Sequence, residues 1–513
     1  MIALALAAAL AAPANAATVK IFAYDEKGST LDLQGFLKRL ARSDEKSPHD
    51  PEKSPFWAFP IDGKSPPERV KLSQDGGTLS ASWPGGPARL ELVWPVAEDG
   101  YNDVTADNGG QGFSHGSEVF LNEDLALTQY RIFKDAWRRR TTDWRPLYKP
   151  GNKAKELFEK AKEATSAASR LKEAPARAKA FDKALQATAL AWEKALFEHG
   201  TQIALDERRG KELRFGLTLD DSLLQRMDDV TWISEAVARS GSDWVRLVLR
   251  PNGSDFLYSS LRSFNEYDGI VAELKKNKIK ILACLLDTAQ WPKTLTPEAY
   301  GERVKNIVLH YKGKVDAWEV GSEINGDWLG GSSSPLNPEQ VYKIFSAGAA
   351  KAKELDPETE TMATLYWWEA TAPDREHSLT GWLKAHAGKG FGKNLDVVGL
   401  ALYPEDNPVG TSFDRAFDAV AEALPAQRLM LSSFGYAEQD ELKGYWWLAP
   451  DDVDGARKDI AILYTAAACA MPRSVGGGFW WQTLEQMLPP GHHKAADLFK
   501  IHRRTLTQLG RKE

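Results

Sequence analysis

A carboxylic acid stands at the end of one short segment, in the stretch KVDAWEVGSEINGDW at residues 314–328. Residues 315–320 are mainly apolar and bounded by glycines, a pattern that predicts a buried strand. Glu323 follows this strand, with Asn325 and Trp328 close behind. A glutamic acid supplies a proton and an indole supplies a flat apolar face, and sugar chemistry uses the two side by side. An isolated strand end with a solvated glutamate would show the same pattern, so the surrounding elements decide between the two interpretations.

The elements that would position this glutamate alternate from residue 211 to residue 513. Apolar segments predicted as strands occur at residues 213–219, 244–249, 279–285, 315–320, 362–366, 397–402, 429–432 and 475–481. Amphipathic segments between them predict helices, for example at residues 296–311, 338–354 and 454–471. Eight strands alternating with helices over about 300 residues predict a closed (β/α)8 TIM barrel, with its chemistry at the carboxyl ends of the strands. An open doubly wound sheet is the alternative, but no glycine-rich phosphate turn follows the first strand.

Composition excludes several kinds of partner. The 513 residues are 27% charged with a formal net charge of −6, so we expect no surface for nucleic acid or an anionic membrane. Cys284 and Cys469 lie in apolar segments without metal-ligand spacing, so we expect two buried free thiols, no metal and no cofactor. The glycines at residues 476–478 predict close packing of a strand, because no Lys-Ser/Thr pair follows them. A monomer is the expected state.

The chain begins with an apolar leader. Residues 1–16 read MIALALAAALAAPANA, an apolar run that ends in the small-residue pattern Ala14-Asn15-Ala16. This pattern predicts a signal peptide, although the usual basic start is missing, and the run is too short to span a membrane. We therefore expect a mature chain that begins near Ala17 and is secreted or periplasmic. No other segment approaches the length of a membrane span.

Two smaller units precede the predicted barrel. Residues 17–150 combine alternating apolar residues with dense Gly and Pro turns, which predicts a small β-sandwich. Its aromatic residues would form either the core of the sandwich, which we favour, or a carbohydrate-binding face; they are Trp57, Trp83, Trp94 and Tyr101. Residues 151–210 are rich in Ala, Lys, Glu and Leu and are interrupted near Pro175, so they predict a helical hairpin that serves as a linker.

The predicted strand ends resemble those of the clan A glycoside hydrolases, which are retaining (β/α)8 enzymes, over about residues 212–509. The fourth strand ends in WEVGSE, and the resemblance makes Glu323 the general acid/base. On the second strand, Arg246 is similar to a buried arginine that steadies the nucleophile carboxylate. Tyr403 after the sixth strand resembles an aromatic residue of the cleft, and Trp480 or Trp481 after the eighth resembles the sugar platform.

The seventh strand departs from the family pattern. The family carries a nucleophilic glutamate there, but this chain reads Leu431-Ser432-Ser433-Phe434-Gly435-Tyr436, with Ser433 at the nucleophile position. Retaining cleavage needs two carboxyl groups about 5–5.5 Å apart, and an uncharged hydroxyl does not replace one of them. Ser322 in place of an asparagine, and Ala401 where a histidine is common, are lesser departures. We expect Ser433 to be a small polar filler without nucleophilic activity.

Another carboxylate would have to replace the missing nucleophile. An inverting mechanism needs a partner about 6.5–9.5 Å from the acid, which relaxes the geometry. We rank three candidates for a second carboxylate, namely Glu438, Glu485 and Glu369. Five further carboxylates follow predicted strands, so we expect them to surround the same opening at the carboxyl ends of the strands. They are Asp220, Asp221, Asp287, Glu405 and Asp406.

Three functions fit this sequence. The first is an exported glycosidase that acts on a poly- or oligosaccharide with Glu323 as general acid/base. The second is a carbohydrate-binding pseudoenzyme that kept the cleft after losing the nucleophile, and the third, which the tryptophans at strand ends disfavour, is a structural scaffold. The first two share a carbohydrate ligand and one predicted set of binding residues: Arg246, Ser322, Asn325, Trp328, Trp368, Tyr403, Trp480 and Trp481.

Overall fold

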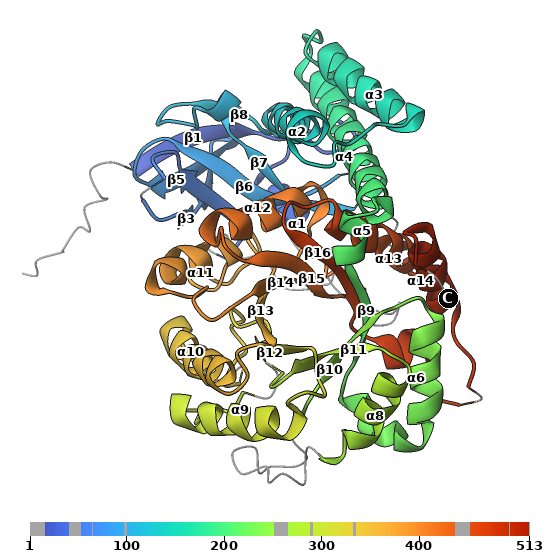
Figure 1. Ribbon diagram of the computed structural model, residues 1–513. Coiled ribbons are helices and arrows are strands. Elements are labelled where there is room, and N and C mark those ends of the chain that lie inside the picture. Colours follow the sequence, from blue (N-terminus) through green and yellow to red (C-terminus); the bar gives the residue numbers. More distant parts are fainter. Residues whose placement is uncertain are drawn as a thin grey trace, which may run out of the picture.

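The structure is a computed structural model, shown in Figure 1, and it describes most of the chain. The described residues are 16–40, 53–63, 65–96, 100–250, 265–287, 291–331, 335–436, 452–491 and 493–511. The predicted leader at residues 1–16 lies outside these ranges except for Ala16, and so does the candidate carboxylate Glu438.

Eight parallel strands close into a barrel in the C-terminal part of the chain, in the order β10-β11-β12-β13-β14-β15-β16-β9. Each strand coincides with a predicted apolar segment to within a few residues. The strands are β9 (Arg214–Leu219), β10 (Trp244–Val248), β11 (Lys280–Cys284), β12 (Ala317–Gly321), β13 (Glu360–Tyr366), β14 (Val397–Leu402), β15 (Arg428–Phe434) and β16 (Ser474–Trp480). The predicted TIM barrel is confirmed, and the doubly wound alternative is excluded because the sheet closes.

Helices between the strands surround this barrel (Figure 1). They are α6 (Val230–Arg239), α8 (Asp268–Lys276), α9 (Pro297–Tyr311), α10 (Pro338–Leu355), α11 (Leu379–His386), α12 (Phe413–Ala423), α13 (Val453–Cys469) and α14 (Asp497–Gln508). Their starts follow from local chemistry: Asn337 and Gln340 form a capping box at the start of α10, and Thr296 caps α9. Each places an apolar face on the strands, which leaves the loops at the strand ends free to build a site.

The barrel interior changes character along its axis. Near the amino ends of the strands, apolar side chains fill it as one cluster: Trp244, Leu282, Ala317, Met362, Val397, Met430, Val475 and Phe479. Above this plug lies a buried polar layer that includes Arg246, Glu319, Thr364 and Ser432. Residues 476–478 of β16 all have positive φ, and a Cβ on Gly477 would lie 2.1 Å from the carbonyl oxygen of Leu431. Only glycine permits this approach, as predicted.

Two four-stranded sheets form the sandwich, in the orders β4-β5-β1-β8 and β3-β2-β6-β7. The strands are β1 (Ala16–Phe22), β2 (Phe56–Pro60), β3 (Glu68–Arg69), β4 (Lys71–Asp75), β5 (Thr78–Pro84), β6 (Ala88–Pro95), β7 (Tyr101–Ala106) and β8 (Glu118–Phe120). Helices α1 (Leu33–Leu40) and α2 (Leu121–Arg138) pack on one shared core with them, and the sequence analysis missed both. Trp57, Trp83, Trp94 and Tyr101 are all buried, so they form no exposed sugar-binding face.

A helical hairpin joins the sandwich to the barrel. Helix α3 (Asn152–Ala168) lies against the long helix α4 (Ala174–Leu205), which also packs on α2 and on the barrel helix α13. The hairpin lies at the top of Figure 1, and α4 runs down from it to the barrel, where the short α5 (Arg209–Glu212) precedes β9. A buried ion pair between Arg140 and Asp414, 2.6 Å apart, joins the turn that follows α2 (Arg139–Asp143) to α12.

The sandwich also contacts the loop that follows β13. The indole nitrogen of Trp57 donates to the carbonyl oxygen of Ala370 at 2.9 Å, and Asp103 accepts the backbone N–H of the same residue at 3.1 Å. Arg415 on α12 pairs with Asp103 and with Glu91 of the sandwich at 2.8 and 2.9 Å. The sandwich is therefore braced against a loop that begins at the carboxyl end of a barrel strand.

Candidate functional site

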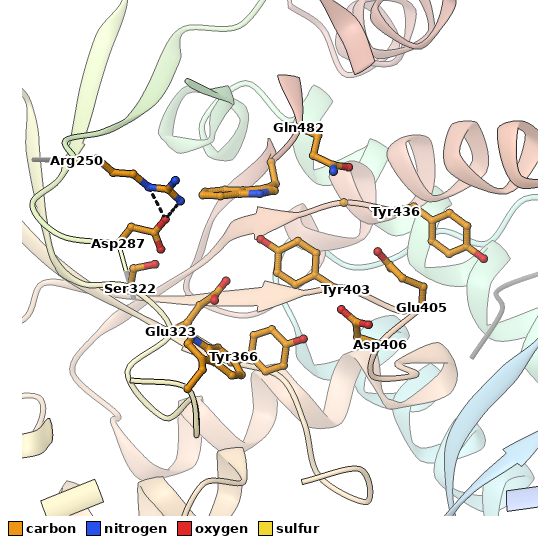
Figure 2. Close-up of a pocket in the computed structure, with 13 residues that line it drawn as sticks. Arg250, Asp287, Ser322, Glu323, Tyr366, Tyr403, Glu405, Asp406, Tyr436 and Gln482 are labelled. Atoms are coloured by element: carbon orange, nitrogen blue, oxygen red, sulfur yellow. Dashed lines mark hydrogen bonds and ion pairs between the residues drawn. The ribbon is translucent and has the colours of Figure 1, made fainter. Parts of the chain in front are cut away.

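A cavity of about 360 Å³ opens at the carboxyl ends of the barrel strands (Figure 2). Loops after β10, β11, β12, β14, β15 and β16, and the last residue of β13, supply its wall. The lining residues are Arg250, Asp287, Ser322, Glu323, Trp328, Tyr366, Tyr403, Glu405, Asp406, Gly435, Tyr436, Trp481 and Gln482. Ionisable groups and aromatic rings therefore line the same cavity, which is the usual composition of a small-ligand site.

Glu323 is half-buried at the cavity wall, and Figure 2 shows its carboxyl group pointing toward Tyr403. The pKa of Glu323 is raised to about 8, chiefly by burial and also by the nearby negative charges of Asp287 and Glu319, while Arg246 and a hydrogen bond from Tyr403 act in the opposite direction. The residue also has a positive φ of 46°. Backbone strain of this kind at a non-glycine residue is concentrated at functional sites. At neutral pH the carboxyl group is therefore protonated, the state that a proton donor needs.

Tyr403 connects Glu323 to the nucleophile position. Its hydroxyl lies 2.7 Å from the Oγ of Ser433 and also hydrogen-bonds Glu323. Two hydrogen bonds in series span no more than about 6 Å, so a carboxyl oxygen of Glu323 and the Oγ of Ser433 lie within that distance of each other. Both residues lie on the same rim of the barrel. Ser433 itself is buried and uncharged.

Arg246 does not pair with the nucleophile position. Its Nε and Nη2 donate to the two oxygens of Glu319 at 2.6 and 3.0 Å, and both side chains are almost fully buried. This pairing corrects the expectation that the arginine steadies a group on the seventh strand. Burial inside the barrel lowers the pKa of the Arg246 guanidinium, but the negative charge of Glu319 raises it by more. The pKa of Arg246 is therefore higher than its ordinary value.

Hydroxyl groups extend this buried pair across the barrel. Thr364 on β13 donates to Glu319 at 2.5 Å and lies 2.8 Å from the Oγ of Ser432, which in turn donates to a backbone carbonyl on β14. Arg246 also donates to the Oγ of Ser322 at 3.0 Å, and Ser322 lines the cavity. The Arg246–Glu319 ion pair therefore lies directly beneath the cavity and forms its floor.

Comparisons with solved structures return glycoside-hydrolase barrels. Xylanase 10B from Thermotoga petrophila RKU-1, in complex with xylobiose, is 14% identical over 61% of this chain and 97% of that chain, with a TM-score of 0.42. Native xylanase 10B from Thermotoga maritima is 14% identical over 62% and 98%, with a TM-score of 0.44. GH5_18 from Streptomyces cattleya, in complex with GlcNAc, is 14% identical over 59% and 81%, with a TM-score of 0.41.

The likeness to these glycoside hydrolases is one of fold. No protein-family model matches the chain, and no match was found among curated proteins. Identities and TM-scores this low do not bear on activity. What the chain does therefore has to be inferred from the chemistry of its own cavity.

The predicted binding residues divide into two groups. Ser322, Trp328, Tyr403 and Trp481 line the cavity. The others do not line it; they are Arg246, Asn325, Trp368 and Trp480.

Three residues of the second group have supporting roles. Asn325 is buried, and its amide braces the wall by donating to the carbonyl oxygens of Tyr366 and His377. Trp480 belongs to the barrel core, where its indole nitrogen donates to Gln486. Trp368 packs behind Tyr366. Neighbouring side chains at a strand end thus face opposite sides of the sheet. The family resemblance alone did not show which of Trp480 and Trp481 faces the cavity.

The ranking of the second carboxylate is corrected in the same way. Glu369 lies outside the cavity lining and is held by Arg375 and Thr380. Glu485 is exposed and also outside the lining. The carboxylates that do line the cavity beside Glu323 are Asp287, Glu405 and Asp406. Figure 2 places Asp287 on one side of Tyr403, near Glu323, and the other two on the opposite side.

The sequence analysis missed several residues that build the site. Arg250, Tyr366, Tyr436 and Gln482 line the cavity, and Arg250 pairs with Asp287. Glu319 was missed as well, although a charged residue inside an otherwise apolar strand was a visible signal for it. The four cavity residues named first lie within a few positions of predicted strand ends, and that closeness was the signal that could have found them.

Two observations concern metals and membranes. In the described ranges, no group of three or more His, Cys, Asp or Glu side chains is arranged to hold a metal ion. Among the helices that the structure describes, none is long and apolar enough to cross a bilayer. Cys284 and Cys469 are both buried free thiols, as predicted.

Proposed function

We propose that this protein is an exported glycosidase that acts on a poly- or oligosaccharide, with Glu323 as the general acid/base. The observation that carries the proposal is a carboxyl group with a pKa of about 8 at the wall of an aromatic-lined cavity. Raised carboxyl pKa values in clefts are typical of proton donors. Trp328, Tyr366, Tyr403 and Trp481 supply flat faces on which sugar rings stack.

The proposed mechanism is inverting, with Glu323 protonating the leaving oxygen. A second carboxylate would then activate water on the opposite face of the sugar ring. Asp287, Glu405 and Asp406 are the described groups that line the same cavity and carry the required chemistry. Ser433 is the reason for preferring inversion, because it places no carboxylate where a retaining nucleophile would stand.

A second function is favoured by the same serine. If no carboxylate meets the required distance from Glu323, the protein binds sugars without cleaving them. The aromatic rings and the buried Arg246–Glu319 floor would then serve recognition alone. Binding with and without turnover distinguishes the two functions.

The test is a panel of poly- and oligosaccharides assayed for hydrolysis and for binding with one preparation. We expect hydrolysis of at least one glycan, lost in Glu323→Gln while binding stays within a fewfold of the parent. The rate should fall as the pH rises through about 8, because the proton donor then loses its proton. Equal rates in Glu323→Gln and the parent would remove Glu323 from the mechanism, and binding without any turnover would establish the second function.

The leader adds a proposal about location. We propose cleavage after Ala16 and export from the cytoplasm, which the apolar run and the small-residue pattern support. Expression of the full chain followed by N-terminal sequencing of the exported fraction tests it. An uncleaved chain that stays with the cytoplasmic fraction would contradict the proposal.

A further inference from the structure

The wall of the cavity carries more carboxylates than cations. Besides Glu323, three carboxylates line it, whereas Arg250 is the one cationic side chain among the described lining residues; the three are Asp287, Glu405 and Asp406. Arg250 forms an ion pair with Asp287. In Figure 2 this pair lies on one side of Tyr403, and Glu405 and Asp406 lie on the other side. Glu405 and Asp406 therefore form an acidic end of the cavity.

A tight turn after β14 holds these two carboxylates beside two tyrosine rings. The backbone N–H groups of Asp406 and Asn407 both donate to the carbonyl oxygen of Tyr403, at 3.1 and 2.9 Å. The side-chain amide of Asn407 donates to the hydroxyl of Tyr366 at 2.7 Å, and the rings of Tyr366 and Tyr403 stack with their centroids 5.9 Å apart. Glu405 is 7% exposed, whereas Asp406 is exposed. The turn and both rings therefore form one braced wall of the cavity.

The phenol of Tyr366 lies near the carboxyl groups on both sides of this wall. Burial raises its pKa well above the ordinary value, and the negative charges of Asp406, Glu323 and Glu405 raise it further. Charges act on one another in this way only over short distances. A ligand in contact with the Tyr366 ring is therefore close to the acidic end of the cavity and also to the proposed proton donor.

Carboxylates beside aromatic faces are the groups that recognise an organic ammonium ion. The carboxylates accept its N–H donors, and the negative faces of the rings attract its charge. A calcium or magnesium ion needs six or more oxygen ligands, whereas flat ring faces supply none. An anionic sugar would be repelled by the same carboxylates. The chemistry of this wall therefore favours a ligand that carries a protonated amine.

We propose that Glu405, Asp406 and the rings of Tyr366 and Tyr403 form a subsite for a primary ammonium group, and that the substrate is a glycan with amino sugar units. The amino sugar rests on the proposed glycosidase function, whereas the ammonium subsite does not. A sugar ring on this wall would direct its amine toward the turn and its glycosidic oxygen toward Glu323. Asp287, on the same side of Tyr403 as Glu323, then remains for the activation of water.

Two sources can supply the ammonium group, namely a free small amine and an amino sugar. Four probes separate them: methylammonium, glucosamine, N-acetylglucosamine and glucose. Glucose shares the ring of glucosamine without its nitrogen, and N-acetylglucosamine keeps the nitrogen without its charge. Methylammonium keeps the charge without the ring. All four are compared at about pH 6, where the two amines are protonated.

The experiment is titration calorimetry of the full chain with each probe. We expect glucosamine to bind roughly tenfold more tightly than each of the other three, because it alone offers both the charge and the ring. Added sodium chloride should weaken the binding of glucosamine more than that of glucose, since only the former depends on charge. Equal affinities for glucosamine and glucose would overturn the subsite. Equal affinities for glucosamine and methylammonium would overturn the amino sugar as its ligand.

Two variants remove one charge each and keep the shape of the side chain. Glu405→Gln should reduce the preference for glucosamine over glucose roughly tenfold, because the charge of a buried carboxylate is little screened. Asp406→Asn should reduce it only about twofold to threefold, because this side chain is exposed. Asp135→Asn, at an exposed position on α2, is the matched control and should behave as the parent does. An unchanged preference in a folded Glu405→Gln would overturn the proposal.

A crystal soaked in glucosamine locates the amine without any variant. A sugar nitrogen within hydrogen-bond distance of Glu405 or Asp406 would support the subsite even if Glu405→Gln failed to fold, whereas a nitrogen directed away from both would overturn it. None of these measurements depends on hydrolysis. Ammonium binding without turnover would therefore support the subsite and contradict the glycosidase, and turnover of neutral glycans alone would support the glycosidase and overturn the amino sugar.

Discussion

The raised pKa of Glu323 has a consequence for stability that can be measured without knowing the substrate. Its ordinary value is 4.5 and its value in the folded protein is about 8. Between these values the folded state holds a proton that the unfolded state releases, so the free energy of unfolding falls as the pH rises through this interval. Each factor of ten in proton affinity corresponds to about 1.4 kcal/mol, and the whole interval to about 5 kcal/mol.

The perturbation is Glu323→Gln, which cannot titrate. Because the side chain is half-buried and open to the cavity, solvent screening reduces the effect, and we expect between about 2 and 5 kcal/mol. Below pH 4.5 the difference in unfolding free energy between parent and variant should be constant. As the pH rises to about 8 the parent should lose stability relative to the variant by that amount, and the difference should be constant again above it.

The assay is urea unfolding at a series of pH values, with Glu163→Gln, an exposed carboxyl on α3, as the matched control. Other titrating groups are present in both parent and variant, so they cancel in the difference. A difference that does not change with pH would show that Glu323 ionises normally. The assignment of Glu323 as a proton donor would then lose its physical basis.

Three further substitutions test the fold around the site. Glu319→Ala leaves a buried guanidinium without its partner and should lower the urea-unfolding free energy by about 3–5 kcal/mol; a change below about 1 kcal/mol would contradict the buried pair. Trp57→Leu removes the indole that donates a hydrogen bond to the loop after β13, and it should lower the free energy of unfolding by about 2–4 kcal/mol in the same assay. An unchanged urea midpoint would mean that the sandwich does not brace the barrel. Gly477→Ala forces a Cβ against the Leu431 carbonyl at positive φ and should prevent soluble expression, whereas Gly301→Ala, where a Cβ meets open space, should be tolerated.

The strands of the barrel were predictable because each carries its own signal. Each is a short apolar run that packs on both faces, against the interior and against a helix. Helix α10 was predictable for a similar reason, since Asn337, Pro338 and Gln340 specify its start locally. Helices α1 and α2 lay hidden inside a region dense with turn residues, and their stability comes from the core they share with the sandwich.

The position of Glu323 at a strand end, and the serine at position 433, could be read directly from the order of residues. Which side chains meet could not, because contacts such as Arg246 with Glu319, or Tyr403 with Ser433, join strands that are 73 and 30 residues apart in the chain. One residue along a strand reverses the direction of its side chain, which is why Trp481 faces the cavity and Trp480 the core. The pattern of apolar and polar residues therefore determined the barrel strands and the residues at their ends. Closure of the barrel decided which charged side chains share the cavity, such as Glu323 and Asp287, and which form a buried ion pair beneath it, as Arg246 and Glu319 do.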